Sequence, residues 1–339
     1  MSLFRTLVRA VAPAAVMLGL AATPAPAEQI RVGYIPIIGA APIFVADKEG
    51  WLKEGGLEPK FTTFESGPNM IQALASGTID VYVAGIAPLA VARSKGIDVK
   101  VVAATAIEEM VFVAGPKLAP YFGADTKAAD AFKAFKAKEG KNARLGTQPP
   151  GSVPDTTLKH WLWKVGAVDK ADADIVALGI DATQQAVLAG AIDGATVREP
   201  AVSIIRARNP NVKIIALGGV MFPNQPGTVV GVSGAWAAKN PDGVQKLVNA
   251  VVKAIDLLKK DPDKAVPAVG AALGKGIVDD AIVKTALTSP ATKFLADPRV
   301  IAAPTAEMQA FQVSIGTLEK DIPLDGLIDA SFYAKATAK

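Results

Sequence analysis

The sequence predicts an α/β protein with two related, doubly wound lobes, and two observations support this prediction. First, the chain contains a partial copy of itself. A shift of 113 positions, from Arg31 to Arg144, also places segment 77–80 on 190–193 without a gap. This period is too long for a solenoid and has the length of a small lobe. Second, strand-like and helix-like segments alternate in both copies, which is typical of a mostly parallel sheet with helices on both faces.

The first copy contains four expected strands with helices between them. Short apolar, β-branched runs predict the strands, and helices are expected over 42–51 and 89–94. A third helix is expected to start at Ser66, a good N-cap residue that is followed by Pro68, and to end at Gly77. The four strands are expected over 30–34, 60–64, 80–84 and 99–104.

The second copy repeats this order of elements. Helices are expected over 155–166 and 182–189. In the first of these helices the apolar spacing predicts four inward-facing side chains, Leu158, Trp161, Leu162 and Val165. The strands are expected over 143–146, 174–177, 193–197 and 213–217.

Segments outside the two copies complete the domain organisation. Residues 110–114 are expected to cross between the lobes, and residues 228–233 to return. An amphipathic helix from Pro241 is expected to pack on the first lobe. Two crossovers form a hinge, so we expect the cleft between the lobes to open and close. The predicted domains are a signal peptide over 1–27, lobe I over 28–110 plus 228–339, and lobe II over 111–227.

The first 27 residues resemble a secretion signal. Arg5 and Arg9 precede an uncharged, mostly apolar run over 10–22, and Ala25–Ala27 forms a small-x-small cleavage site. The run is shorter than a membrane span requires. Because no cysteine follows the cleavage site, a lipid anchor is not expected. We therefore expect an exported, soluble, periplasmic protein.

Composition excludes several classes of function. The 339 residues include no cysteine and one histidine, which argues against thiol nucleophiles, disulfides and most zinc sites. We expect no metal and no cofactor. Removing Arg5 and Arg9 lowers the net charge from +4 to +2, so a nucleic-acid partner is not expected either.

Several segments resemble one family. "IRVGYIPIIGAAPIFVADKEGWLKEGGLEPKF", "FESGPNMIQALASGTIDVYVAG", "GTQPPGSVPD" and "LAGAIDGATVREPA" occur in order, and "NQPGTVVGVSGAWAAKNPDGVQKLVNAVVKAIDLLKKDPDKA" continues them. They are similar to the nitrate/sulfonate/taurine-type (NMT1-like) periplasmic substrate-binding proteins of ABC importers. The resemblance covers roughly residues 30–260.

The resemblance implies a type II periplasmic-binding-protein fold and a transport function. Such a protein captures a small solute by closing its cleft, and passes it to a membrane permease with a cytoplasmic ATPase. An anion is favoured: a sulfonate, nitrate, bicarbonate or a related organic acid. The chain has no GxxxxGK[ST] sequence, which agrees with ATP hydrolysis residing elsewhere. We expect a monomer without enzymatic activity.

The candidate ligand-binding residues follow from the predicted sheets. In open parallel sheets, ligands bind outside the carboxyl ends of the strands, and this rule selects six loops. Glu109 is added because it precedes the first crossover. The complete set is Tyr34, Pro36, Ile38, Ser66, Gly67, Gly85, Ile86, Glu109, Thr147, Gln148, Gly151, Ser152, Arg198 and Glu199.

Two of these loops suit an oxyanion. At Ser66–Gly67 a helix begins, so free N–H groups and the positive end of the helix dipole face the expected cleft. The hydroxyl, amide and glycine N–H groups of 147–152 suit the same kind of ligand. The alternatives are an ordinary N-cap at Ser66 and an exposed proline-rich turn over 147–152.

The charged candidates leave the ligand class open. Arg198 stands where many relatives have tryptophan, and it either binds an anion or pairs with Glu199. Glu199 either accepts from the solute or holds the hinge. A carboxylate from Glu109 in the cleft would disfavour a bare anion and favour an amine or polyol. Relatives that bind taurine carry an acid near the return strand, whereas this chain has Thr228 there, which disfavours taurine.

Two other functions are compatible with the predicted fold. Pyrimidine-synthesis enzymes resemble this fold and use lysine-bound pyridoxal phosphate with clustered histidine and cysteine, whereas here His160 stands alone. A ligand-sensing partner of a signalling receptor would use the same cleft, and the sequence does not separate it from a transport protein.

Overall fold

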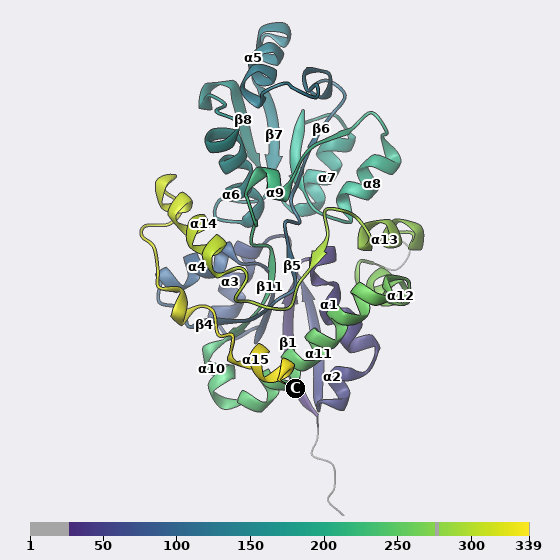
Figure 1. Cartoon of the computed structure of the whole chain (residues 1–339), viewed down its shortest axis with the longest axis vertical. Helices are drawn as coiled ribbons and strands as arrows, with labels where there is room; N and C mark the ends of the chain where they lie inside the picture. Colours follow the sequence, from purple (N-terminus) through teal and green to yellow (C-terminus); the bar gives the residue numbers. More distant parts are fainter. Residues whose placement is uncertain (1–26, 275–277, 339) are drawn as a thin grey trace, which may run out of the picture.

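Two five-stranded sheets, each covered by helices, form two lobes in this computed structural model, which describes residues 27–274 and 278–338 (Figure 1). The predicted signal peptide lies outside the described residues except for Ala27. We call the body around the first sheet lobe I and the body around the second sheet lobe II.

The sheet of lobe I has the order β2-β1-β3-β11-β4. Its strands are β1 (Glu28–Tyr34), β2 (Leu57–Thr63), β3 (Val81–Gly85), β4 (Val99–Ala104) and β11 (Thr228–Ser233). The helices around it are α1 (Ala41–Lys48), α2 (Trp51–Glu54), α3 (Gly67–Ala75), α4 (Ala87–Ser94), α10 (Gly234–Lys239), α11 (Pro241–Lys260), α12 (Pro262–Ala272) and α15 (Ser331–Thr337).

The sheet of lobe II, read from its other edge, has the matching order β8-β7-β9-β6-β10. Its strands are β6 (Val111–Ala114), β7 (Ala143–Thr147), β8 (Ala173–Ala177), β9 (Gly194–Val197) and β10 (Lys213–Leu217). Its helices are α5 (Ala128–Glu139), α6 (Val153–His160), α7 (Ile180–Leu188), α8 (Ala201–Arg208) and α9 (Gly218–Met221).

The two lobes share one topology, as the internal repeat predicts. In lobe I, β11 lies between β3 and β4 and is antiparallel to both. In lobe II, β6 takes the same place between β9 and β10. Four strands of each sheet therefore run in one direction and the crossover strand runs against them, which confirms the expected, mostly parallel sheets.

The repeat also recurs in a pair of aspartates. The carboxylate of Asp80 accepts from the backbone N–H of Arg31 at 3.0 Å, and that of Asp193 accepts from Arg144 at 2.9 Å. The backbone N–H of each aspartate donates back to the same arginine at 2.8 Å. Each aspartate thus fastens the start of its strand to a neighbouring strand, a structural role.

Most expected elements lie where the sequence places them, with one correction. Leu158, Trp161 and Leu162 are buried, but Val165 is 47% exposed, so its predicted inward orientation is wrong. After α6 the chain continues as a π-helix over Trp161–Val165. The wider turn rotates Val165 off the face that a regular α-helix would share with Leu158.

Two chain segments connect the lobes side by side. One contains β5 (Ala106–Ile107), which pairs with β12 (Lys293–Phe294), and the other contains Gln225 and Pro226. The N–H of Glu108 donates to the carbonyl of Gln225 at 2.9 Å, and Ile107 bridges to Pro226. This double connection is the hinge geometry that the sequence predicts.

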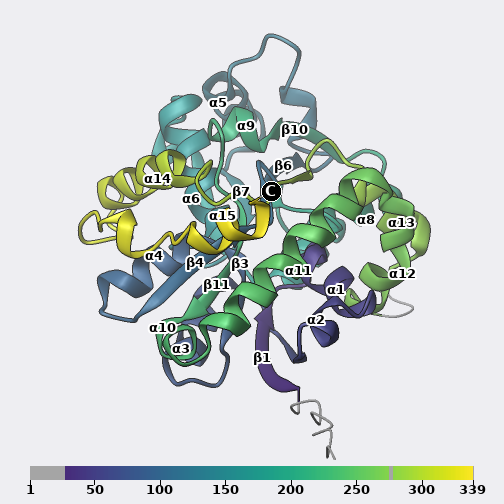
Figure 2. The same ribbon diagram turned by 60° about the horizontal axis from the view of Figure 1, so that its bottom comes forward.

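The C-terminal segment contacts both lobes (Figure 2). Helix α11 packs on α1 of lobe I, with an apolar stripe that includes Val244, Leu247 and Val251. Further along, α13 (Asp280–Leu287) contacts α8 of lobe II, and α14 (Ala302–Ser314) contacts both α4 and α6. Within the described ranges, no helix combines the length and the apolar character needed to span a bilayer.

Candidate functional site

The strand-end loops of the two lobes meet in a closed seam. The backbone N–H of Ile38 in lobe I donates to the carbonyl of Glu199 in lobe II at 3.0 Å. Gly85 faces Val153 so closely that a Cβ at position 85 would lie 2.6 Å from Val153 Cγ2. Because β-carbons do not approach other atoms to this distance, glycine at position 85 allows the lobes to close.

A buried polar cluster lies within this seam. Arg198, which follows β9, donates from Nη1 to Glu109 Oε1 at 3.2 Å and from Nη2 to Gln148 Oε1 at 3.4 Å. Thr228, the first residue of β11, donates its hydroxyl to the same Glu109 oxygen at 2.6 Å. All four side chains are buried, and none is more than 4% exposed. We call these four residues the seam cluster.

Residues from different parts of the fold build the seam cluster. Glu109 and Thr228 lie on the two crossover segments, whereas Gln148 and Arg198 follow strands of lobe II. An ion pair this well buried is poorly screened by water, and burial of either charge alone would be costly. The arrangement therefore couples lobe II to the hinge through charge.

One oxygen of the seam cluster has no hydrogen-bond partner. Oε2 of Glu109 is buried and finds no donor among the described residues. It lies against Gly39, where a Cβ would collide with it. Gly39 belongs to the loop of lobe I that also carries Ile38, so this oxygen lies on the lobe I side of the seam, next to the loop that contacts lobe II.

The predicted helix start at Ser66 lies close to the seam cluster. Ser66 occupies the N-cap position of α3, yet its hydroxyl makes no capping bond and is buried without a partner in the described part of the chain. A Cβ at Gly67 would lie 2.6 Å from the Tyr82 hydroxyl, which donates to the carbonyl of Gly85 at 2.8 Å. Burial raises the pKa of Tyr82, and the positive charge of Arg198 opposes this shift.

Several polar groups of the 147–152 loop form hydrogen bonds within lobe II. The hydroxyls of Thr147 and Thr196 share a hydrogen bond of 2.7 Å. Ser152 caps α6 by accepting from the backbone N–H of Asp155 at 3.3 Å, and Gly151, with φ of +82°, donates its N–H to the Asp155 carboxylate at 3.4 Å. These contacts shape the loop that presents Gln148 to Arg198.

Two predicted residues have clear structural roles. Tyr34 packs edge-on against Phe44 and Phe61, and its hydroxyl donates to the carbonyl of Ala272 at 3.4 Å. Its side chain therefore packs within lobe I and does not join the seam cluster. The carboxylate of Glu199 accepts from the backbone N–H of Ser203 at 3.1 Å and so holds the first turn of α8.

The remaining candidates belong to the walls of the seam. Pro36 is half-buried and Ile38 is buried, and both lie on the loop that meets Glu199. Ile86 is buried and donates its N–H to the carbonyl of Gly227 at 3.1 Å.

The strand-end rule includes Gly39 in the first loop of lobe I, but it selects neither Val153 nor Thr228 as part of the site. Thr228 stands where taurine-binding relatives carry an acid, and in the structure Glu109 of the other crossover contacts Thr228. A repeat-based alignment would not have found the contact, since neither residue lies in the repeated stretches.

The space beside the seam cluster is small in this closed form. A cavity of about 10 Å³ is bordered by Gln148, Thr196 and Arg198, which is room for a single water molecule. A wider hollow of about 470 Å³ lies between α3, α4 and Gly151 at the edge of the seam. A solute of several atoms would therefore reach the cluster only after the lobes move apart.

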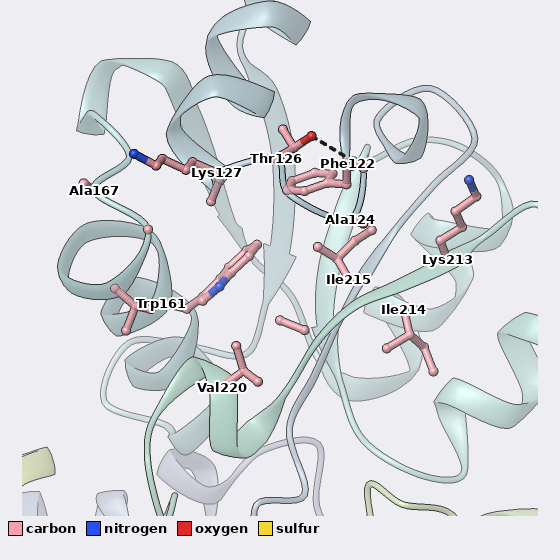
Figure 3. A pocket seen from close by; sticks show the side chains of 15 residues that line it. Phe122, Ala124, Thr126, Lys127, Trp161, Ala167, Lys213, Ile214, Ile215 and Val220 are labelled. Atoms are coloured by element: carbon pink, nitrogen blue, oxygen red, sulfur yellow. Dashed lines mark hydrogen bonds between the residues drawn. The ribbon is translucent and has the colours of Figure 1, made fainter.

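Another hollow lies on lobe II away from the seam. It has a volume of about 650 Å³ and includes Phe122, Trp161, Val220 and the lysines Lys127 and Lys213 (Figure 3). None of the predicted ligand-binding residues lines it. In the described part of the chain, no three histidine or acidic side chains gather as metal ligands would.

Comparison with known proteins shows similarity to proteins named for sulfonate binding and for nitrate import. The chain is 24% identical over 315 residues to a putative aliphatic sulfonates-binding protein of Bacillus subtilis (strain 168), covering 91% of this chain and 88% of that protein. It is 24% identical over 234 residues to the nitrate import ATP-binding protein NrtC of Synechococcus elongatus. That match covers 68% of this chain but 35% of NrtC, so the chain spans about a third of that relative.

Solved structures show the fold. The periplasmic nitrate-binding protein NrtA of Synechocystis matches with a TM-score of 0.76 and 15% identity, covering 91% of this chain and 88% of that chain. The two-lobed architecture is the periplasmic-binding-protein fold. The model of the NMT1-like family matches residues 23–272. This match covers most of the chain, which therefore belongs to the NMT1-like family.

Proposed function

We propose that this protein binds a small polar solute between its lobes and delivers it to an ABC importer. The seam cluster is the observation that carries this proposal. Buried charged and polar side chains destabilise the folded state unless all their groups are hydrogen-bonded or paired. Where they occur with an unsatisfied group, a functional role is a reason for their presence. Here Glu109 keeps one oxygen without a partner among the described residues, and the cluster joins lobe II to the hinge through Arg198.

Relatives and geometry together favour an oxyanion group on the solute. A sulfonates-binding protein, a nitrate import protein and a bicarbonate transport protein are among the relatives. The hydroxyl of Ser66 and the first turn of α3 offer hydrogen-bond donors, and Arg198 offers a guanidinium. We assign the solute contacts to Ser66, Gly67, Gln148, Arg198 and Glu109, with Ile38, Gly85 and Gly151 as walls.

The position of the single histidine and the lack of cysteine argue against a pyrimidine-synthesis-type enzyme of related fold. His160 is buried against Phe222 and Phe311, and its Nδ1 lies 2.8 Å from the carbonyl of Met221. These contacts give His160 a packing role in α6, and among the described residues it forms no hydrogen bond with the seam cluster that would let it donate a proton there. Cysteine is absent from the sequence. Binding without turnover is the function that these residues support.

The proposal includes export and the partners of an importer. A leader with Arg5 and Arg9 and no following cysteine fits a periplasmic protein without a lipid anchor. A membrane permease and its ATPase are the proposed partners, and the protein is proposed to act as a monomer. A sensing role would replace these partners by a receptor.

A thermal-shift screen of the mature chain, refolded to remove carried-over solute, tests the proposal. The panel contains alkanesulfonates, taurine, nitrate, bicarbonate, aromatic carboxylates and pyrimidines. A solute at about 100 times its Kd stabilises a protein by roughly 2.7 kcal/mol. A hit that also stimulates the ATPase of the reconstituted importer supports the proposal. Stabilisation without stimulation favours sensing, and absence of any hit contradicts the assignment of solute class.

A further inference from the structure

We infer that the solute carries an N–H or O–H group that donates to Oε2 of Glu109. A bare oxyanion such as nitrate would then not be the preferred ligand. This inference rests on the proposed function and narrows its substrate class to oxyanions with an amino or hydroxyl substituent, and to bicarbonate. The seam cluster supplies the evidence.

The first step is the unequal use of the two Glu109 oxygens. Oε1 accepts from Arg198 at 3.2 Å and from Thr228 at 2.6 Å, whereas Oε2 accepts from no described residue. Glu109 is 3% exposed, so bulk water does not satisfy Oε2 in the closed form. A buried acceptor without a donor is unfavourable, and a solute that donates to it removes this penalty.

The second step is the charge balance of the seam. Arg198, the one buried guanidinium of the seam cluster, already pairs with the buried carboxylate of Glu109. Glu199 is bound to the N–H of Ser203, and Arg198 is already bonded to Glu109 and Gln148. A bare anion would have to compete with Glu109 for Arg198 and would meet the repulsion of the Glu109 carboxylate.

The third step is access. Oε2 faces Gly39 on the lobe I loop, and the neighbouring Ile38 forms the hydrogen bond to Glu199 that closes the seam. Opening of the seam moves Arg198 and Gln148 of lobe II away from Glu109, whose carboxylate lies beside Gly39 and Thr228 on the lobe I side. A donor group on the solute could then approach Glu109 from the open cleft before the lobes close.

Matched solutes test the inference in the wild-type protein. Calorimetric titrations compare ethanesulfonate with its 2-hydroxy form, isethionate, and its 2-amino form, taurine. Nitrate and bicarbonate form a second pair of small planar monoanions, of which only bicarbonate has an O–H group. We expect isethionate and taurine to bind at least about tenfold more tightly than ethanesulfonate, and bicarbonate at least about tenfold more tightly than nitrate. Only these three solutes carry a group that can donate to Oε2.

A variant tests whether the Glu109 carboxylate causes the preference for solutes that carry a donor group. Glu109→Gln replaces one acceptor oxygen by a donor amide, so it should lower the preference to about threefold or less and strengthen binding of the donor-free anion. Glu108→Gln is the matched control, because the adjacent Glu108 pairs with Lys293 outside the cluster. The control should retain the wild-type preference.

The outcomes separate this inference from the proposed function. Donor-free and donor-bearing solutes that bind wild-type protein equally would overturn the inference and leave the proposed function intact. The same holds if Glu109→Gln weakens all solutes equally, because a purely structural carboxylate would act this way. If none of the five solutes binds, both the oxyanion class and this inference are wrong. The wild-type comparison remains decisive if the variant does not fold.

Discussion

The backbone N–H of Ile38 and the carbonyl of Glu199 form a 3.0 Å hydrogen bond that connects the two lobes across the seam. It joins a loop after the first strand of lobe I to a loop after a strand of lobe II. The packing of Gly85 against Val153 also crosses the seam near the cluster. Both contacts belong to the closed form, and a hinge motion that separates the strand-end loops would break them together.

An engineered disulfide should report this closure. A Cβ at Gly85 would lie 3.1 Å from the Cβ of Val153, slightly closer than in an ordinary disulfide. Because the chain has no cysteine, Gly85→Cys with Val153→Cys introduces the only thiols. We expect the two thiols to form a disulfide once the backbones at positions 85 and 153 move slightly apart, measured by loss of titratable thiol, and the disulfide should then block solute exchange.

The single variants are the controls for this experiment. Gly85→Cys alone and Val153→Cys alone should keep their thiols under the same oxidant. If the double variant also keeps both thiols, with or without solute, the two positions do not meet in solution.

Breaking the ion pair of the seam cluster should destabilise the protein. Arg198→Met leaves the buried Glu109 carboxylate without its cation, and such a loss costs about 3–5 kcal/mol. Adding Glu109→Leu should recover much of this loss, because no unpaired charge then remains. Urea unfolding of both variants measures the two free energies. A loss below about 1 kcal/mol for Arg198→Met would show that the pair is hydrated in solution.

The internal repeat made most of the fold predictable. Equivalent positions such as Gly33 and Gly146 occur on equivalent strands, β1 and β7. The strands and helices predicted in one copy therefore supported the same elements in the other. The sequence pattern did not predict that β6 and β11 each insert into a sheet antiparallel to its other four strands. Tertiary contacts decide which strands pair, and the local sequence does not record them. Val165 was misplaced because apolar spacing assumes a regular helix, which the π-turn interrupts.

The candidate site was predictable only in its loops. The rule for strand ends brought Ile38, Gly85 and Arg198 to one seam. The same rule could not orient Tyr34. In β1, that residue lies on the same face as Ile30 and Val32, and this period-two pattern indicates packing within the lobe. The contact between Glu109 and Thr228 joins residues far apart in sequence, for which no local signal exists.

The paired aspartates should contribute similarly to stability despite a visible difference. Asp80 also forms a salt bridge with the Arg31 side chain, whereas Arg144 directs its side chain to the carbonyl of Ala191. The Arg31 guanidinium contacts both oxygens of Asp80, but its side chain is 44% exposed, so solvent screens the ion pair and we expect a small contribution. We expect Asp80→Ala and Asp193→Ala each to cost about 1–3 kcal/mol through the orphaned backbone N–H.

Arg31→Met is the matched test of this reasoning, and we expect it to cost less than about 1 kcal/mol. Chemical denaturation of the three variants gives the comparison. A loss for Arg31→Met as large as that for Asp80→Ala would mean that the side-chain ion pair, rather than the backbone bond, provides the stability.

Ser66→Ala should separate binding from folding. The Ser66 hydroxyl is buried and makes no hydrogen bond with described residues, so its removal should leave the free energy of unfolding within about 1 kcal/mol of wild type. Binding of the best sulfonate in the screen should weaken about tenfold if the hydroxyl donates to the solute. Titration calorimetry and denaturation measure the two effects.

Ser233→Ala provides the contrasting control. Ser233 caps α10 by accepting from the N–H of Trp236 at 3.2 Å, and loss of such a cap costs about 1 kcal/mol. This variant should lose stability and keep its affinity. Unchanged affinity in Ser66→Ala would remove Ser66 from the proposed contacts.

Buried His160 should make stability depend on pH. Burial lowers the pKa of His160 below its ordinary value of 6.5. The unfolded chain then binds a proton more readily than the folded one, so stability should fall as pH drops from about 7 toward the lowered pKa. Asp155 has the opposite sign, because burial raises its pKa above 3.8, and protonation there favours the folded state at more acidic pH.

The two effects occupy different pH ranges, so a His160→Gln variant isolates the first. Its amide can donate to the carbonyl of Met221, which the ring nitrogen now contacts at 2.8 Å, but it does not titrate. We expect the difference in Tm between pH 7.5 and pH 5.5 to be smaller in the variant than in wild type. An equal difference in the two proteins would show that His160 does not cause the pH dependence of stability.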